Sequence, residues 1–176
     1  MNTPTKVAVS IFILIFAARI IYADKIEISI HKTSPTGKGV QIGYVTVEDT
    51  PYGLLLTPSI EGLTPGPHGF HIHQNPDCRA KDKGGKMVPG LAAGGHYDPA
   101  SAGKHLGPYQ EGHLGDLPIL WVDSEGKAKT PVLAPRVKVS DLKGRSLMIH
   151  AGGDNYSDMP RKLGGGGARA ACGIVP

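Results

Sequence analysis

The sequence predicts an all-β fold, an antiparallel sandwich or barrel built as one domain. Short apolar runs alternate with polar residues at the two-residue period of a half-buried strand. The 176 residues include 25 glycines and 15 prolines, which break the chain into many short segments joined by turns. No segment sustains the 3.6-residue apolar period of an amphipathic helix. A chain of this length can bury one substantial core and is too short for two.

The predicted strands follow one another along the chain between turn-forming clusters. The first, residues 25–31, reads KIEISIH and places its three isoleucines on one face. The third, residues 53–60, contains Pro58, which has no backbone N–H, so we expect an edge strand or an interrupted strand there. The remaining predicted strands are residues 40–47, 69–73, 118–122, 129–134, 146–150 and 170–175.

The N-terminus reads as a secretion signal that covers residues 1–23. Its apolar run, residues 7–18, is shorter than a bilayer-spanning helix, and Ala23 is the expected last residue before cleavage. Ile21 stands where a small residue is usual in such a signal, so an uncleaved N-terminal anchor is the alternative. In either case the domain that follows, residues 24–176, is expected to be exported.

The charge of the chain argues against a nucleic-acid partner. Removal of Lys6 and Arg19 with the signal lowers the net charge from +4 to +2, and the sequence has no basic stripe with interleaved aromatic residues. Three lysines lie close together in KDKGGK, at Lys81, Lys83 and Lys86. They form either a solvated loop or a positive field that attracts a small anion.

Two long segments interrupt the strand pattern, residues 74–117 and residues 151–169. Long ordered loops in a compact domain are usually functional. The second loop contains the glycine run 164–167, for which a flexible linker is the alternative interpretation. The only cysteines are Cys78 and Cys172, and an isolated pair in an exported chain is most simply one disulfide.

The histidines are concentrated in one part of the chain, because six of the eight lie between residues 68 and 113. His71 and His73 are two residues apart on a predicted strand, so both side chains leave the same face and form a bidentate clamp. His150 ends another apolar strand and could meet them across the sheet. An H-x-H pair alone is weak evidence for a metal, since a lone histidine on a strand is most often an ordinary core or surface residue.

The other candidate ligands follow in the first long loop: His96, His105, His113 and Asp116. Three imidazoles and a carboxylate suit zinc, and four imidazole nitrogens in a near-plane suit copper(II). Two such sites need seven histidine positions, but six histidines remain once His31 and His68 are set aside as peripheral. One histidine must then serve both metals through both ring nitrogens, and His96 lies between the two sets in the sequence.

Six segments carry a resemblance to a known family. They are GFHIH (69–73), NPDC (75–78), GGHYDP (94–99), GHLGDLP (112–118), MIHAGGDNYSD (148–158) and LGGGGARAACGI (163–174). With these motifs in this order, the chain resembles the exported bacterial copper–zinc superoxide dismutases over essentially all of residues 25–176. The resemblance implies an eight-stranded antiparallel Greek-key barrel, flattened into a sandwich, with two long functional loops and a periplasmic location.

The resemblance also implies a complete set of site residues. It implies copper on His71, His73, His96 and His150, and zinc on His96, His105, His113 and Asp116. It implies a disulfide between Cys78 and Cys172, an aspartate at Asp154 that links ligands of both metals by hydrogen bonds, and a guanidinium over the copper from Arg169.

An enzyme of this kind converts two superoxide anions and two protons into oxygen and hydrogen peroxide. Copper would be the catalytic cofactor because zinc has no redox chemistry, and His96 would hold a proton when copper is reduced. Arg169 suits the anionic substrate, since it stays charged and offers directed donors. We expect Lys162 and the three lysines of KDKGGK to help steer superoxide to the site.

Two other functions and two oligomeric states stay open at this level. A carrier of copper and zinc without turnover would have lost the arginine or a copper ligand, yet all are present in this sequence. An adhesion-type sandwich with incidental histidines would bind no metal. Trp121 lies either at a homodimer contact or in the core. No membrane contact is expected once the signal is removed.

Overall fold

The computed structural model of this chain describes residues 25–176, so the predicted signal, residues 1–23, lies outside the described residues. Within that range, no helix is long and apolar enough to cross a membrane. The strands are β1 (Ile26–Ser34), β2 (Gly37–Thr50), β3 (Gly53–Glu61), β4 (Gly66–His68), β5 (Phe70–His73), β6 (Lys81–Asp82), β7 (Met87–Val88), β8 (Leu120–Val122), β9 (Lys127–Ala128), β10 (Val132–Ala134), β11 (Ser146–His150) and β12 (Arg169–Ile174). The 3-10 helices are η1 (Leu91–Ala93), η2 (Val139–Leu142) and η3 (Leu163–Gly165).

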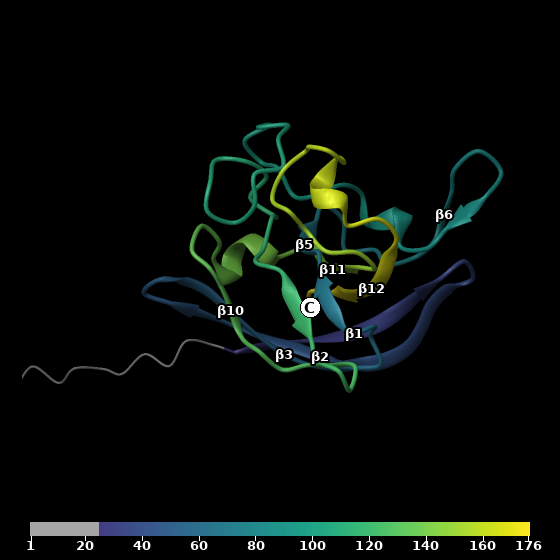
Figure 1. Cartoon of the computed structure of the whole chain (residues 1–176), viewed down its shortest axis with the longest axis horizontal. Helices are drawn as coiled ribbons and strands as arrows, with labels where there is room; N and C mark the ends of the chain where they lie inside the picture. Colours follow the sequence, from purple (N-terminus) through teal and green to yellow (C-terminus); the bar gives the residue numbers. More distant parts are fainter. Residues whose placement is uncertain (1–24) are drawn as a thin grey trace, which may run out of the picture.

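The main antiparallel sheet curls into a half-barrel (Figure 1). Its strand order is β10–β3–β2–β1–β12–β11–β5, with β9 also paired with β3, while β4 pairs with β8. Only Gly69 separates β4 from β5, so together they act as one strand that joins β8 to β11. One half of the curled sheet contains β10, β3, β2 and β1, and the other contains β12, β11, β5, β4 and β8. The connections from β3 to β4 and from β10 to β11 therefore cross from the first half to the second, as in a Greek key. The predicted all-β, antiparallel fold is confirmed.

Strand β3 shows how this sheet accommodates a proline. It pairs with β2 over residues 53–60 and with β10 and β9 on its other side, so it is an interior strand, and the prediction of an edge strand is wrong. On its other side, β10 pairs only with residues 54–56 and β9 only with residues 60–61. Pro58 lies in the gap between these partners, where its missing N–H costs no ladder hydrogen bond. The predicted interruption is thus confirmed on one side of the strand.

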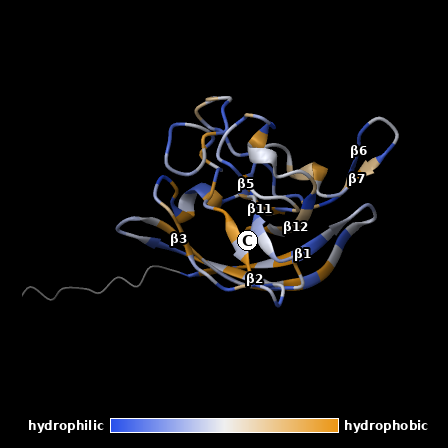
Figure 2. Cartoon of the chain, viewed as in Figure 1, coloured by the Kyte–Doolittle hydropathy of each residue, from blue (hydrophilic) through white to orange (hydrophobic). Residues whose placement is uncertain are grey.

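The core lies between the two halves of the curled sheet. In Figure 2, hydrophobic residues colour the strands around this interior, and hydrophilic residues dominate the outer loops. The largest fully buried side chains include Ile28, Ile30, Leu54, Leu56, Phe70, Ile72, Leu120 and Leu147. Burial of each such side chain contributes roughly 1.5–3 kcal/mol to the stability of the fold. The well-packed core therefore supports the strands from which the long loops extend.

Several strands differ in length from the sequence-based expectation. The predicted strand at residues 118–122 begins only at Leu120, and the one at residues 129–134 begins only at Val132, directly after Pro131. The structure adds β4, β6, β7 and β9, which are two or three residues long. Segments this short cannot show an alternating apolar pattern, so their pairing is decided by neighbouring strands.

The environment of Trp121 is also decided by the structure. Its neighbours on β8, Leu120 and Val122, are buried, so the indole between them faces outward and is 54% exposed. The interpretation of Trp121 as a core residue is therefore wrong.

Candidate metal centre

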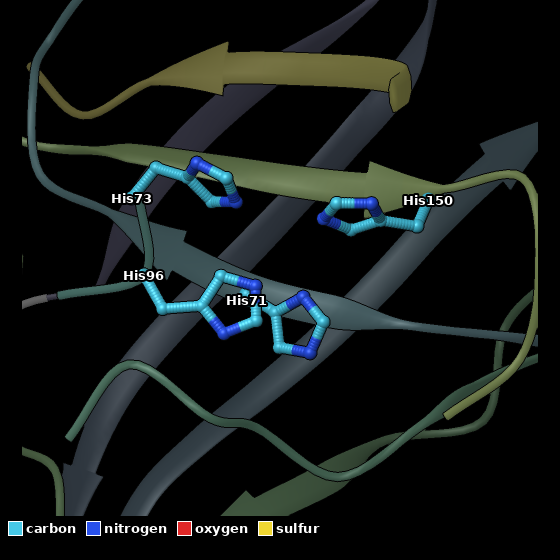
Figure 3. A group of neighbouring side chains, drawn as sticks. All are labelled: His71, His73, His96 and His150. Carbon is cyan, nitrogen blue, oxygen red and sulfur yellow. The ribbon is translucent and has the colours of Figure 1, made fainter. Parts of the chain in front are cut away.

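Four histidines converge above the sheet from two strands and one loop (Figure 3). His71 and His73 leave the same face of β5, and His150 ends the adjacent strand β11. His96 belongs to the first long loop and pairs with His73 through an isolated β-bridge. One ligand nitrogen from each of the four lies within 4.8 Å of those of the others, and all four side chains are buried. The predicted clamp on β5 therefore meets its two predicted partners.

A second group of ligands surrounds Asp116. Its Oδ1 lies 2.8 Å from Nδ1 of His96 and 3.4 Å from Nδ1 of His113, and its Oδ2 lies 3.0 Å from Nδ1 of His105. His71, His96, His105 and Asp116 also place ligand atoms within 4.8 Å of one another. The loop that carries these residues lies, with the loop 151–169, over the β5 and β11 side of the sheet (Figure 1).

Six buried ring nitrogens in the described part of the chain have no hydrogen-bond partner. They are Nδ1 of His71, Nε2 of His73, Nε2 of His96, Nδ1 of His105, Nδ1 of His113 and Nε2 of His150. An unsatisfied buried polar group costs about 1–3 kcal/mol, so native proteins rarely leave even one without a reason. A cluster of imidazole nitrogens without partners can bind copper and zinc, and the residues present fit both metals.

The opposite ring nitrogen of most of these histidines is held in place. Nδ1 of His73 lies 2.9 Å from the carbonyl oxygen of Gly94, and Nδ1 of His150 lies 3.2 Å from that of Gly167. Such contacts select the tautomer and the ring orientation of a metal ligand. His96 differs, because its Nδ1 faces Asp116 while its free Nε2 belongs to the four-histidine group. His71 also belongs to both groups, but its Nε2 is held by Asp154, so among the described residues it is His96 that turns a different ring nitrogen to each group.

Asp154 forms hydrogen bonds with one histidine of the four-histidine group and with one histidine of the group around Asp116. Its Oδ2 accepts a hydrogen bond from Nε2 of His71 at 2.8 Å, and its Oδ1 accepts one from Nε2 of His105 at 2.7 Å. The carboxylate is fully buried. A Cβ on Gly164 would lie 1.8 Å from Oδ1 of Asp154, and one on Gly166 would lie 3.1 Å from Cγ of His150. The glycine run is therefore packed against the site, and its interpretation as a flexible linker is wrong.

The pKa shifts follow this arrangement. The pKa of His71 is lowered to about 3 and that of His150 to about 4; burial is the largest cause, nearby His96 acts in the same direction, and hydrogen bonds oppose the change. Burial, followed by the charge of His96, also holds the pKa of His73 well below its usual range. These imidazoles are neutral at physiological pH, which is the form that binds a metal.

His105 behaves in the opposite way because two carboxylates face it. Burial alone would lower its pKa, but the facing carboxylates of Asp116, 3.0 Å from Nδ1, and Asp154, hydrogen-bonded to Nε2, outweigh burial and raise the pKa to about 9. In both aspartates, burial raises the pKa, but contacts with the histidines outweigh it and hold the pKa below its usual range. The two carboxylates thus favour a positive charge at His105. A cation bound next to His105 would supply that charge in place of the proton.

Arg169 and the disulfide lie beside the four-histidine group. Arg169 is paired with His150 across the β11–β12 ladder, and its Nη1 and Nη2 donate to the carbonyl oxygens of Gly90 (2.8 Å) and Gly94 (2.5 Å). Its charge contributes to lowering the pKa of both His73 and His150, although burial is the largest cause. The expected disulfide between Cys78 and Cys172 is present, with a Cα–Cα distance of 5.7 Å.

The predicted steering lysines do not contact these histidines. Lys81, Lys83 and Lys86 lie on or between β6 and β7, a ribbon that projects from the body of the domain (Figure 1), and Lys162 is exposed in the second loop. The Lys81–Lys86 segment is thus solvated, as the first of its two interpretations predicts.

One histidine that the sequence reasoning set aside contacts the site. His68 is buried, with Nδ1 2.5 Å from the carbonyl oxygen of His150 and Nε2 2.8 Å from that of Thr64. It therefore anchors the backbone of a candidate ligand. The only available signal was its place three residues before His71, which does not distinguish an anchoring residue from a surface residue.

Comparisons with known proteins agree with this geometry. The sequence profile of the copper/zinc superoxide dismutase family (SODC) matches residues 41–175. The chain is 54% identical over 154 residues to a copper–zinc superoxide dismutase of Pasteurella multocida, covering 86% of this chain and 83% of the relative. It is 59% identical over 154 residues to copper–zinc superoxide dismutase 1 of Salmonella typhimurium, covering 86% and 87%.

Solved structures give the same result. A Cu/Zn superoxide dismutase from Brucella abortus superposes with a TM-score of 0.85 at 50% identity, over 87% of this chain and 100% of that chain. The solution structure of the monomeric copper, zinc superoxide dismutase from Salmonella enterica superposes with a TM-score of 0.79 at 48% identity, over the same two shares.

Proposed function

Because this chain belongs to the copper/zinc superoxide dismutase family, we propose that its two groups of ligands each hold one metal ion. In this proposal copper binds His71, His73, His96 and His150, and zinc binds His96, His105, His113 and Asp116. The chain is an enzyme that converts two superoxide anions and two protons into oxygen and hydrogen peroxide.

The single observation that carries the ligand assignment is the position of His96. Its Nδ1 lies 2.8 Å from Oδ1 of Asp116, and its Nε2 is buried without a partner among the four histidines. Its ring is stacked on His71 with the ring centroids 3.9 Å apart, which leaves the imidazole little freedom to turn away. An imidazole in this position can serve two cations at once.

The remaining residues orient the proposed copper ligands, hold a proton and attract the anionic substrate. Bound copper supplies the one-electron redox chemistry, which zinc lacks. His71, His73 and His150 keep their free nitrogens together because the opposite ring nitrogens are held by Asp154, Gly94 and Gly167. We propose that Nε2 of His96 is the atom that holds a proton during turnover. The guanidinium of Arg169, fixed by two carbonyl oxygens, offers a positive charge to the incoming anion.

The test of the shared ligand loads both sites with copper(II) and records the electron paramagnetic resonance (EPR) spectrum. An imidazolate between two copper ions couples their spins, so we expect a strongly reduced signal from the unsubstituted protein. His96→Gln should restore the signal of two separate ions, whereas His31→Gln, on β1 and outside both groups, should not. A full-intensity signal from the unsubstituted protein would contradict the shared ligand.

We also propose that residues 1–23 are a cleaved signal and that residues 24–176 reside in the periplasm. The disulfide between Cys78 and Cys172 supports an oxidising compartment. Mass spectrometry of the periplasmic fraction should find Asp24 as the first residue. A chain that keeps Met1 and sediments with membranes would instead favour the uncleaved anchor.

For the oligomeric state we propose a homodimer with Trp121 at the contact. The exposed indole supports this, since tryptophan is enriched at protein interfaces. The relative from Salmonella enterica, by contrast, is described as monomeric. Light scattering should give the mass of two chains for the unsubstituted protein and of one chain for Trp121→Lys. A monomer at micromolar concentration without any substitution would exclude the proposal.

A further inference from the structure

The crossover between β10 and β11, residues 135–145, contributes no proposed ligand but carries two half-buried arginines. Arg136 precedes η2, and Arg145 follows it just before β11 begins. Neither belongs to the motifs that identify the family in this sequence. Their guanidinium groups nevertheless reach toward the backbone of the two ligand groups.

Arg136 contacts the segment that carries a proposed zinc ligand. Its Nη2 donates to the carbonyl oxygen of Gly112 at 3.1 Å, and its Nη1 lies 3.4 Å from the carbonyl oxygen of His113. The N–H of His113 donates to the carbonyl oxygen of Lys104 at 3.0 Å, so this backbone is held from both sides. The planar guanidinium group of an arginine can donate to two successive carbonyl oxygens from two different nitrogens. The single ammonium group of a lysine does not have this geometry.

Arg145 contacts two chain segments at the place where they meet. Its guanidinium lies 3.5 Å from the ring centroid of Tyr97, which follows His96, and its Nη1 donates to the carbonyl oxygen of Gln74 at 3.0 Å. Gln74 follows His73 and is itself joined to Gly95 by a backbone hydrogen bond of 3.0 Å. His73 and His96 form the isolated bridge between these segments.

We propose that Arg136 and Arg145 are positioning residues, each of which fixes the backbone of one ligand group from outside the centre. Arg136 sets the position of His113 and thereby the affinity for zinc. Arg145 contacts both the segment that follows His73 and the segment that follows His96. It thereby fixes the relative position of these two proposed copper ligands. The two arginines act through different contacts, so their effects on the two metals are separable. This inference rests on the ligand assignment proposed above.

The experiment compares Arg136→Gln and Arg145→Gln, with Arg136→Lys and Arg145→Lys as conservative variants. Lys143→Gln is the control, because Lys143 is an exposed cation of the same crossover. Zinc affinity is measured by competition with a chromophoric chelator, and the zinc site is also read from the visible spectrum of its cobalt(II) form. Copper geometry is read from the copper(II) hyperfine coupling by EPR, and copper release from its rate of transfer to a chelator.

We expect Arg136→Gln to weaken zinc binding about tenfold, at the lower end of what loss of an outer contact to a ligand costs, and to leave the copper hyperfine coupling unchanged. Arg145→Gln should change that coupling and speed copper release about tenfold, with a smaller loss of zinc affinity through the shared His96. Each lysine variant should fall between the glutamine variant and the unsubstituted protein, since lysine keeps the charge but loses the planar guanidinium geometry.

Equal losses of both metals in both glutamine variants, with a lowered melting temperature of the metal-free protein, would reduce the arginines to general stabilisers and overturn the proposal. Glutamine variants that match Lys143→Gln in every measurement would overturn it as well. The ligand assignment is judged separately, on the unsubstituted protein: if its EPR and cobalt spectra lacked the signatures of histidine ligation, the assignment itself would have failed.

Discussion

At the scale of single residues, Asp154 is the group on which both ligand sets depend. Its Oδ2 accepts an N–H from His71, and its Oδ1 accepts one from His105 and one from the backbone of Tyr156, so a single buried carboxylate orients one proposed ligand of each metal. Hydrogen bonds to a charged acceptor contribute roughly 1.5–3 kcal/mol each, enough to select one tautomer of each ring. The position of Asp154 depends in turn on the close approach of a glycine backbone.

Gly164→Ala tests this packing. The new Cβ would lie 1.8 Å from Oδ1 of Asp154 and 2.9 Å from Nε2 of His105, so we expect Asp154 to move and both metals to bind about 10–100-fold more weakly. The measurement is metal content after dialysis against a chelator. Gly165→Ala is the matched control, since its φ of +80° is similar to the +67° of Gly164 but its nearest neighbour, Cβ of Arg161, is 3.8 Å away. Equal metal loss in both variants would show that backbone strain alone is responsible.

At the scale of elements, the disulfide connects the loop after β5 to strand β12. Cys78 follows the strand that carries His71 and His73, and Cys172 lies three residues after Arg169 on β12. The bond therefore limits the distance between the arginine and the histidines proposed to bind copper. It also buries Cys78, Cys172, Ala93 and Met148 in a small apolar cluster apart from the main core.

Cys78→Ser combined with Cys172→Ser should destabilise the domain substantially. The cysteines are 94 residues apart in the sequence, and the chain-entropy model predicts about 4–5 kcal/mol for a loop of that size. Denaturant unfolding of the metal-free protein measures the loss, and adding a reductant to the double variant should change nothing further. A loss below about 1 kcal/mol would mean that the unfolded chain gains little freedom when the bond is removed.

At the scale of the whole molecule, the domain combines a complete apolar core with a polar centre that its own groups leave unsatisfied. Its main core, with side chains such as Ile28 and Leu147, lies between the sheet halves, whereas the six unpartnered nitrogens lie between the sheet and the two long loops. The loops contain few strands of their own, so we expect metal binding to the histidines to contribute to their order.

Removal of both metals should therefore lower the melting temperature by more than about 10 °C. A metal at 1,000 times its dissociation constant stabilises the native state by about 4 kcal/mol, and 1 kcal/mol corresponds to about 2–4 °C for a domain of this size. Calorimetry before and after chelation measures the shift, and adding copper and zinc back should reverse it. An unchanged melting temperature after complete removal would contradict the coupling of metal binding to loop order.

Replacing the four proposed steering lysines by glutamine tests the electrostatic field of the whole molecule. These lysines are Lys81, Lys83, Lys86 and Lys162. We expect a lower rate constant for superoxide at low ionic strength and a flatter dependence on salt, because steering by exposed charges is screened over about 10 Å at 0.1 M salt. Glutamine at four other exposed lysines, Lys38, Lys129, Lys138 and Lys143, is the control. An unchanged salt dependence in the first variant would place the steering charge elsewhere.

The long strands could be predicted from the sequence, but their neighbours in the sheet could not. Alternation of apolar residues was enough to place the long strands, and β1, β5 and β11 lie where it predicted them. It did not find β4 or β9, and it placed Pro58 correctly in an interruption but wrongly at an edge. Strand order depends on partners far away in the chain, and a local pattern carries no information about them.

The residue types and their spacing establish which chemical groups are available: a strand that projects two imidazoles from one face, enough further histidines and a carboxylate for two metals, and a cysteine pair. Which of these atoms meet depends on how the chain folds. Folding brought His150 to His73, placed Gly164 against Asp154, and turned Arg136, Arg145 and His68 toward the ligand backbones. The reason is physical: a side chain's donor atoms and its face on a strand are local properties, whereas a distance of about 3 Å between segments many residues apart exists only after the core has packed.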